Sequence, residues 1–290
     1  IIRELGVEFK TGVEVGKDVS LDALRKQGYA AFYVAIGAQG GRALGVEGED
    51  AKGVVSGIEF LRRVNAGENA KLSGKTVVIG GGNVAVDVAR TAVRSGASEV
   101  TMVCLESRKE MPASEEEIAE AEEEQISIDN GWGPKRILSE TGKVTGVEFK
   151  RCTTVFNAEG RFAPQYDEND TMVVPADAVL VTIGQSILWG DLLAGCDAVT
   201  NRNGTLQADG FTYQSAQKDV FTGGDCYTGP KFAIDAIAAG KQAAISIHRY
   251  VHPGQSLTIG RDRREYKELD KKNAIVETYD NTPRQKPETL

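Results

Sequence analysis

Three consecutive glycines stand between a predicted buried strand at residues 75–79 and a predicted helix at 84–95. With Ala85 they form a G-x-G-x-x-A pattern. In such a loop the glycines allow a tight turn and a close approach of a pyrophosphate, which the N–H groups at the start of the helix can bind. The small alanine lets the helix lie close to the sheet. The strand–loop–helix context therefore predicts a dinucleotide site at Gly80, Gly81, Gly82, Asn83 and Val84.

The end of the next predicted strand, residues 100–104, carries the residues that would distinguish NAD from NADP. Glu106 can accept hydrogen bonds from the adenosine ribose hydroxyls and would repel a 2′-phosphate. Arg108 and Lys109 could instead flank that phosphate, or they could belong to a solvated loop. Because the acidic residue comes first, the sequence predicts a preference for NAD(H) over NADP(H).

A second glycine loop follows a short predicted strand at residues 220–222. Gly223, Gly224 and Asp225 precede a long predicted helix at 232–251. An aspartate at the end of a strand can accept hydrogen bonds from a sugar-alcohol chain, and the N-terminus of the helix can face an electron-rich ring carbonyl. On its own, this loop would be a turn in most proteins.

Composition excludes several other classes of function. The chain has 290 residues, a net charge of −8, four widely spaced cysteines without a CxxC pair, and two histidines. We therefore expect no nucleic-acid partner, no membrane partner, no metal site and no redox dithiol. No cationic-then-apolar segment opens the sequence, and the cysteine usage fits a reducing compartment, so we expect a cytoplasmic protein.

The remaining pattern predicts an α/β protein with parallel strands. We expect a strand or hairpin at 6–15, a helix at 21–27 capped by Ser20, and a buried strand at 31–36 that ends at Gly37. Ser56 with Glu59, and Ser114 with Glu117, have the spacing of capping boxes. Residues 126–175 read as an antiparallel ribbon, and 179–183 as a buried strand that ends at Gly184. The 232–251 helix should bury an alanine and isoleucine stripe, and residues 251–290 form a polar arm.

Together these segments resemble the pyridine-nucleotide-dependent FAD oxidoreductases, most closely the small-subunit family of glutamate synthase. The matching segments, in the family's order, are AIGA at 35–38, LGVEGED at 44–50, GGGNVA at 80–85, EMPA at 110–113, VTIG at 181–184 and FTGGDC at 221–226. They cover about residues 6–250, and as a set they are specific.

The resemblance implies a Rossmann-like NAD(P)-binding domain at 56–195, inserted in a partial FAD-type domain made of 1–55 and 196–250. Hydride would pass from NAD(P)H to FAD, and electrons would then leave to an iron–sulfur centre or a partner subunit. The partner would be an iron–sulfur or amidotransferase-type subunit, or the chain would form a homo-oligomer. By the same resemblance, Asp225 would hold the FAD ribityl chain and the helix start would face the flavin. The residues implied near the flavin are Gly37, Gly224, Asp225, Lys231, Phe232 and Ala233.

The sequence departs from the family in two places. It has a single dinucleotide loop, whereas the family carries an FAD-binding G-x-G-x-x-G unit upstream of the region equivalent to Ile1. We therefore expect a fragment of a longer flavoprotein that holds FAD weakly by itself. NADP-using members also carry two arginines where this chain has Leu105 and Glu106. The alternative interpretation is a non-catalytic nucleotide-binding or assembly module that lacks flavin.

Overall fold

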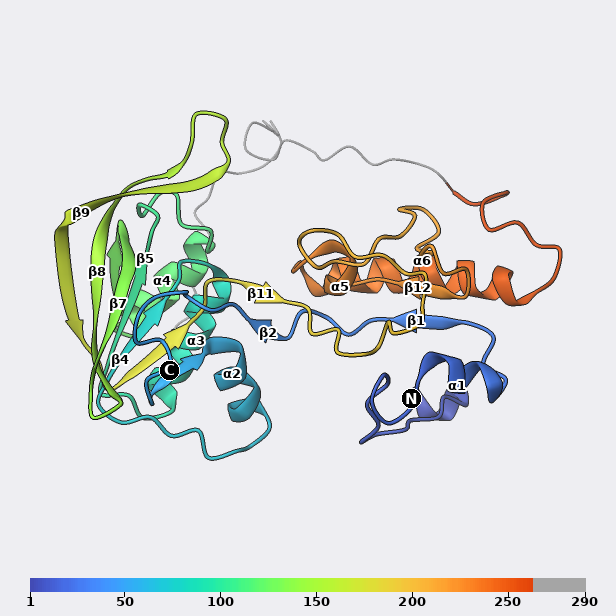
Figure 1. Cartoon of the computed structure of the whole chain (residues 1–290), viewed down its shortest axis with the longest axis horizontal. Helices are drawn as coiled ribbons and strands as arrows, with labels where there is room; N and C mark the ends of the chain where they lie inside the picture. Colours follow the sequence, from blue (N-terminus) through green and yellow to red (C-terminus); the bar gives the residue numbers. More distant parts are fainter. Residues whose placement is uncertain (263–290) are drawn as a thin grey trace, which may run out of the picture. The chain divides into compact units, whose positions relative to one another are not determined.

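The computed structural model describes residues 1–262 and divides the chain into two units, Ile1–Leu257 and Thr258–Leu290. The first unit contains all the helices and strands discussed below (Figure 1). Most of the predicted polar arm at 251–290 lies outside the described residues.

A five-stranded parallel sheet forms the centre of the nucleotide region. Its strand order is β3 (Val54–Ser56), β10 (Ala178–Val181), β4 (Lys75–Ile79), β5 (Glu99–Cys104) and β6 (Ser127–Asn130). Chain segments more than a hundred residues apart in sequence thus lie side by side, since β10 pairs with both β3 and β4. The sheet agrees with the predicted α/β class and with the strands predicted from 75 to 104.

Both faces of this sheet are covered. Helices α2 (Gly57–Asn65), α3 (Asn83–Arg94) and α4 (Glu115–Glu123) pack on one face, where Val78 of β4 meets Phe60, Val86 and Ile118. On the other face lies an antiparallel ribbon of β7 (Trp132–Glu140), β8 (Lys143–Phe156) and β9 (Phe162–Pro175) (Figure 1). Its apolar side chains pack against the alternate β4 residues Val77 and Ile79. A strand buried on both faces has a continuous apolar sequence, which is why these strands could be predicted from the sequence.

A smaller region is built around two parallel strands, β1 (Phe32–Val34) and β12 (Val220–Thr222). Helices α1 (Leu21–Lys26), α5 (Asp225–Thr228) and α6 (Ala233–Val251), together with the short 3-10 helix Arg3–Leu5, complete its regular structure. Its core of buried residues consists of Leu21, Val34, Leu192, Val220 and Cys226. The antiparallel pair β2 (Gly40–Gly41) and β11 (Gln185–Ser186) brings together the two chain segments that run between the regions.

Two of the predicted helix caps form and one does not. The Ser20 hydroxyl accepts a hydrogen bond from Ala23 N at 3.1 Å, and the Ser114 hydroxyl accepts one from Glu117 N at 3.2 Å. Ser56 makes no cap bond, and its buried hydroxyl has no hydrogen-bond partner among the described residues. The Glu59 carboxylate binds Arg62 instead of reaching back to the start of the helix.

One sequence prediction about elements was wrong, and two were wrong in part. Residues 6–15 form no strand, because no neighbouring strand pairs with them, and the side chain of Phe9 is 49% exposed. The ribbon begins at Trp132, since Ser127–Asn130 instead joins the parallel sheet beside β5. In α6 the buried residues are Ala239, Ala243 and Ser246, so the predicted alanine stripe is buried but the predicted isoleucine stripe is not. The exposed isoleucines of this helix are Ile234, Ile237 and Ile245.

The acidic helix α4 is paired with basic residues of the neighbouring helix α3. Arg90 on α3 donates to Glu120, and its Nε lies 2.7 Å from Glu124 Oε1. These ion pairs hold α4 against α3, and Arg94 adds a further pair to Glu124. The acidic run therefore has a structural partner on the neighbouring helix.

Candidate functional site

The glycine loop turns at the carboxyl end of β4. Gly80 has φ +145°, a region that favours glycine, and a Cβ there would lie 2.3 Å from Thr182 Oγ1. Its N–H donates to Val103 O at 2.9 Å, so the loop is held between the ends of β10 and β5. Only a glycine fits at position 80, next to Thr182, without displacing a neighbour, which explains the first glycine of the motif.

The next residues present unpaired N–H groups at the start of α3. Gly82 is the N-cap, has no side-chain cap, and a Cβ built on it would meet no atom within 4 Å. Within the described part of the chain, the N–H groups of Gly82, Asn83 and Val84 have no hydrogen-bond acceptor. Unsatisfied donors at the N-terminus of a 12-residue helix, facing open space, make a binding site for an anion.

Two side chains of the motif serve the loop itself. The Asn83 Oδ1 accepts a hydrogen bond from Ser114 N at 2.9 Å, which ties the loop to the start of α4. Ala85 is fully buried in the core between α3 and the sheet. Asn83 therefore positions the loop with its side chain and can offer a ligand its backbone.

A cavity of about 780 Å³ lies over this loop. It is bounded by the ends of β4, β5 and β10, by the segment after β2, and by the ribbon. The lining residues among the sequence-predicted set are Gly80, Gly81, Gly82, Asn83, Val84, Glu106 and Gly184. The fold thus brings seven of the predicted site residues together at one edge of the parallel sheet, where ligands bind in open α/β folds.

Glu106 lies beside the loop. A Cβ built on Gly81 would be 3.0 Å from Glu106 Oε2 and 3.0 Å from Cys104 Cβ, so Gly81 also occupies a position where a larger residue would not fit easily. Cys104 lies under the loop, where burial above all, with the Glu106 charge adding to it, raises its pKa to about 12. The Cys104 side chain is therefore a neutral thiol near pH 7.

Arg108 is directed away from the cavity. Its guanidinium forms ion pairs with Glu115 and Glu122 of α4, at 3.3 and 3.5 Å, and it is absent from the cavity lining. Lys109 is exposed and is also absent from the lining. The structure therefore does not bring these two cations to Glu106.

The opposite wall of the cavity is formed by the segment after β10. Gly184 has φ +120°, and a Cβ on it would lie 3.4 Å from Arg42 Cδ. Arg42 donates to Gln185 O at 3.3 Å, and no carboxylate lies within ion-pair distance of it in the described residues. Arg42 thus lines the cavity with a charge that has no acidic partner there.

The predicted flavin-type residues lie in the smaller region, around the ends of β1 and β12. Gly37 and Gly224 have φ values of +67° and +69°. The Asp225 Oδ1 accepts a hydrogen bond from Lys231 N at 3.2 Å, which leaves its Oδ2 without a partner among the described residues. At the start of α6 the N–H groups of Ala233 and Ile234 are also unpaired there. The side chains of Lys231 and Phe232 are exposed.

Sequence reasoning missed the contribution of the ribbon to the cavity. Lining residues from β7, β8 and β9 are Trp132, Pro134, Lys150, Phe162, Pro164 and Tyr166. Three of them are spaced by two along β9, the period that puts side chains on one face of a strand. This alternation in the sequence is the signal that indicates one face of β9 directed to the cavity.

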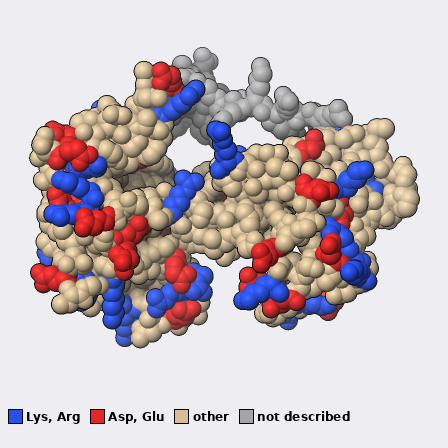
Figure 2. All heavy atoms as spheres, in the orientation of Figure 1, with Lys and Arg blue, Asp and Glu red and all other residues tan. Residues whose placement is uncertain are grey.

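Other kinds of site are absent from the described residues. No group of three or more His, Cys, Asp or Glu side chains is placed to hold a metal ion, and no helix in residues 1–262 is long and apolar enough to cross a membrane. All four cysteines are free thiols. On the face drawn in Figure 2, acidic and basic side chains are interspersed, with no broad basic patch of the kind that nucleic acids bind.

Comparisons with known proteins agree with this geometry. The family model for pyridine nucleotide-disulphide oxidoreductases matches residues 2–240. The beta subunit of the NADP(+)-dependent formate dehydrogenase of Moorella thermoacetica is 35% identical over 264 residues, which are 87% of this chain and 36% of that protein. The glutamate synthase [NADPH] small chain of Escherichia coli is 32% identical over 267 residues, 87% of this chain and 56% of the relative.

Among solved structures, Mycobacterium tuberculosis FprA in complex with NADPH matches with a TM-score of 0.67 at 17% identity, over 82% of this chain and 67% of that one. This likeness supports the fold. The resemblance to the glutamate synthase small-subunit family is confirmed by the sequence relatives, of whose length the chain spans about a third to a little over half. The chain belongs to the pyridine nucleotide-disulphide oxidoreductase family.

Proposed function

We propose that this chain binds a nicotinamide dinucleotide in the cavity over the glycine loop and takes part in hydride transfer between NAD(P)H and FAD. One observation carries the proposal: the unpaired N–H groups of Gly82, Asn83 and Val84 face a cavity of about 780 Å³ at the carboxyl ends of the parallel strands. A pyrophosphate supplies the anionic oxygens that these groups lack. Family membership supports the same chemistry.

In this proposal each loop residue has a distinct part. Gly80 makes the turn against Thr182, and Gly82 leaves room for the pyrophosphate. Glu106 accepts hydrogen bonds from the adenosine ribose hydroxyls. Gly184 forms the opposite wall, on the side of the nicotinamide. Arg108, which the structure pairs with α4, is left without a part in binding.

The residues of the smaller region fit one portion of a flavin site. The free Oδ2 of Asp225 can accept hydrogen bonds from ribityl hydroxyls, and the unpaired N–H groups of Ala233 and Ile234 can face the pyrimidine of the flavin. Gly37 and Gly224 adopt backbone conformations that let the chain approach a ligand closely. Bound FAD would supply the acceptor for the hydride. Lys231 and Phe232 are exposed beside this position.

We further propose that the two regions are the predicted discontinuous domains. The pairing of β1 with β12 supports joining residues 1–55 to 196–250. The boundaries shift in this proposal, because β3 at Val54–Ser56 pairs with β10, and Trp189 and Leu192 pack in the core of the smaller region. Leu44, Val46 and Ala51 also pack in the core of the nucleotide region, so we place the two crossings near residues 41 and 186, where β2 pairs with β11.

The preference for NAD(H) over NADP(H) stays a prediction that rests on Glu106. The named relatives do not support it, since the two reported above carry NADP(+) or NADPH in their names. We propose that electrons pass to a partner subunit, because these relatives are a beta subunit and a small chain of larger enzymes. The alternative, a nucleotide-binding module without electron transfer, predicts NAD(P)H binding with no flavin chemistry. A cytoplasmic location also stays a prediction, which the four free thiols support.

The proposal is tested by titrating the purified chain with NADH and with NADPH, following nicotinamide fluorescence, and repeating the titrations with Gly82→Asp. We expect saturable binding that the new carboxylate abolishes by repelling the pyrophosphate. Added FAD should then report NAD(P)H oxidation if the flavin portion is competent. If the chain binds neither NADH nor NADPH, the proposal is refuted. Binding without any reduction of added FAD would favour the alternative.

A further inference from the structure

The ribbon wall of the cavity lies at the adenosine end of the proposed nucleotide site. In a strand–helix–strand unit, the ribose of the adenosine lies at the end of the second strand. Here that strand is β5, and Leu105 and Glu106 directly follow it and line the cavity. A Cβ on Gly133 of β7 would be 2.4 Å from Tyr166 Cε1 and 2.9 Å from Leu105 Cδ2, so Tyr166 and Leu105 meet at this glycine.

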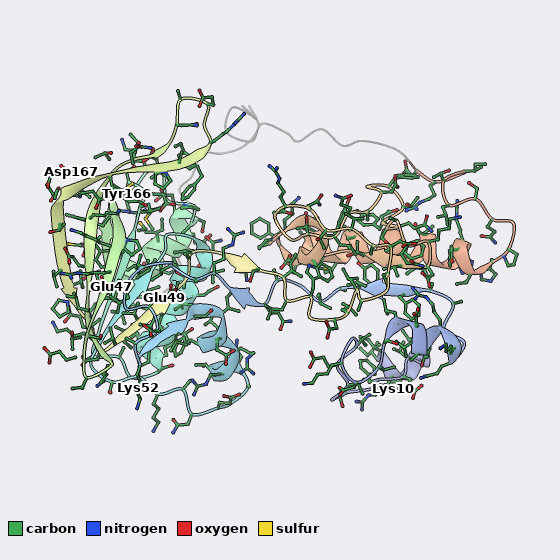
Figure 3. All side chains as sticks on the ribbon, in the orientation of Figure 1. Lys10, Glu47, Glu49, Lys52, Tyr166 and Asp167 are labelled. Carbon is green, nitrogen blue, oxygen red and sulfur yellow. The ribbon has the colours of Figure 1, made fainter. Side chains whose placement is uncertain are left out.

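Lys150 of β8 is held over the ring of Tyr166. Its Nζ lies 4.4 Å from the centre of the ring and 2.6 Å from Glu168 Oε1. The Lys150 side chain is only 20% exposed, whereas that of Glu168 is 61% exposed. Tyr166 and its neighbour Asp167 follow each other on β9 (Figure 3), with Tyr166 half-buried and Asp167 exposed. The ammonium group is thus held in the cavity wall by an aromatic ring and an exposed carboxylate.

An irregularity of β9 creates this arrangement. Lys150 pairs with Thr171, but the next residue, Arg151, pairs with Asp167, so residues 168–170 have no partner across the ladder. This bulge brings Glu168 to Lys150 and Asp170 to Arg151, whose guanidinium also lies 3.6 Å from the ring of Trp132. Bulges commonly redirect side chains beside binding sites. Beside the bulge, Lys150 lies over Tyr166 and Arg151 lies over Trp132. Of these two cations, Lys150 lines the cavity.

Charges on the cavity wall are few. Among the lining residues, the Asp, Glu, Lys and Arg types are represented by Arg42, Glu106 and Lys150. Arg42 lies across from the glycine loop beside Gly184, at the other wall. Lys150 is therefore the cation that the cavity places on the same side as Glu106, a position that the loop cations Arg108 and Lys109 leave open.

We infer that Lys150 is the specificity-determining residue that accepts the phosphate monoester on the adenosine ribose of NADP(H). The inference rests on the proposed nucleotide site. The phosphate replaces Glu168 as the partner of the ammonium group, and the mostly exposed Glu168 turns to solvent. Glu106 and Lys150 then favour different nucleotides. The Glu106 carboxylate favours the free 2′-hydroxyl of NAD(H), and the Lys150 ammonium group favours the 2′-phosphate of NADP(H). Such a pair reconciles an acidic residue after β5 with relatives named for NADPH.

The test compares Kd values for NADPH and NADH, with 2′-phospho-AMP and AMP as competitors, in wild type and four variants. Lys150→Met keeps the apolar stem and removes the charge. We expect it to weaken NADPH and 2′-phospho-AMP binding by roughly 10- to 100-fold, while NADH and AMP change less than about twofold. Lys150→Arg should retain most NADPH binding. Lys143→Met, on the same strand but outside the cavity lining, and Arg108→Met should leave both nucleotides unchanged.

Each other outcome overturns the inference. Equal weakening of NADPH and NADH by Lys150→Met would assign Lys150 a structural or general electrostatic role. Unchanged NADPH binding in Lys150→Met, or selective loss in Arg108→Met, would place phosphate recognition elsewhere while the proposed function stands. If the wild-type chain binds neither nucleotide, the proposed function fails together with the inference, so the two failures are distinguishable.

Discussion

The two regions of the first unit differ in how completely their apolar side chains are buried. In the nucleotide region the sheet is covered on both faces, and Val78, Val86 and Ile118 are fully buried. In the smaller region two strands support α6, where the N-cap residue Phe232 is 73% exposed and Ile234 is 68% exposed. The cavity lies at the edge of the parallel sheet, and this sheet is packed against helices on one face and against the ribbon on the other. Its site is accordingly the better defined of the two.

The substitution with the largest expected effect tests the close contact between Gly80 and Thr182. Gly80→Val places side-chain atoms against Thr182 and forces a β-branched residue to φ +145°. We expect the free energy of unfolding to fall by about 3 kcal/mol or more, and nucleotide binding to be lost. Denaturant unfolding followed by the fluorescence of Trp132, in a Trp189→Phe background, reports on this region.

The matched control is Gly82→Ala, at φ −93°, where a Cβ meets no atom of the protein. Its stability should stay within about 0.5 kcal/mol of wild type while nucleotide affinity falls, because the methyl group occupies the space meant for the pyrophosphate. If Gly80→Val and Gly82→Ala lost stability equally, the assigned roles of the two glycines would be wrong.

The next effect concerns nucleotide choice at Glu106. Glu106→Arg exchanges a carboxylate for a cation next to Gly81, and we expect the NADPH-to-NADH affinity ratio to rise by about tenfold or more, equivalent to about 1.4 kcal/mol. Glu116→Arg makes the same charge change on the exposed face of α4 and should leave the ratio unaltered. An unchanged ratio in Glu106→Arg would remove this residue from the ribose site.

In the smaller region, a pH-dependent ion pair links α1 to the start of β12. Arg25 Nε and Nη2 lie 2.6 and 3.1 Å from the two oxygens of Asp219, and these hydrogen bonds lower the pKa of Asp219. Because the pKa is lower in the folded state, the pair stabilises the fold above the unfolded pKa, near 3.9, and this stabilisation is lost as the pH falls through the folded pKa.

Asp219→Asn should therefore lower the free energy of unfolding by about 1–2 kcal/mol at pH 7, and the difference should shrink as the pH falls through the lowered folded-state pKa of Asp219. The fluorescence of Trp189, which packs in this core, is the measurement, with Trp132 replaced by Phe. A difference that did not vary with pH would mean that the loss comes from packing and not from the charge.

The same contrast explains which features could be predicted from sequence. The strands from 75 to 104 and the glycine loop were predictable, since burial on both faces and the turn chemistry are local properties. Residues 6–15 and the isoleucines of α6 were not, because an alternating or periodic pattern identifies an apolar face but not whether another element covers it. The ribbon side of the cavity was also missed, as Lys150 reaches it through the pairing of β8 with β9 and a bulge in β9.

The smallest expected effect tests that distinction directly. Ile237 on α6 is 54% exposed, and its truncation removes few packing contacts while alanine favours the helix, so Ile237→Ala should change the free energy of unfolding by less than about 0.5 kcal/mol. Ile118 on α4 is fully buried, and Ile118→Ala should cost about 2–5 kcal/mol. Denaturant titration at several protein concentrations measures both. A loss above about 1 kcal/mol for Ile237→Ala would show that this face of α6 is covered in solution, and its dependence on protein concentration would show whether a second copy covers it.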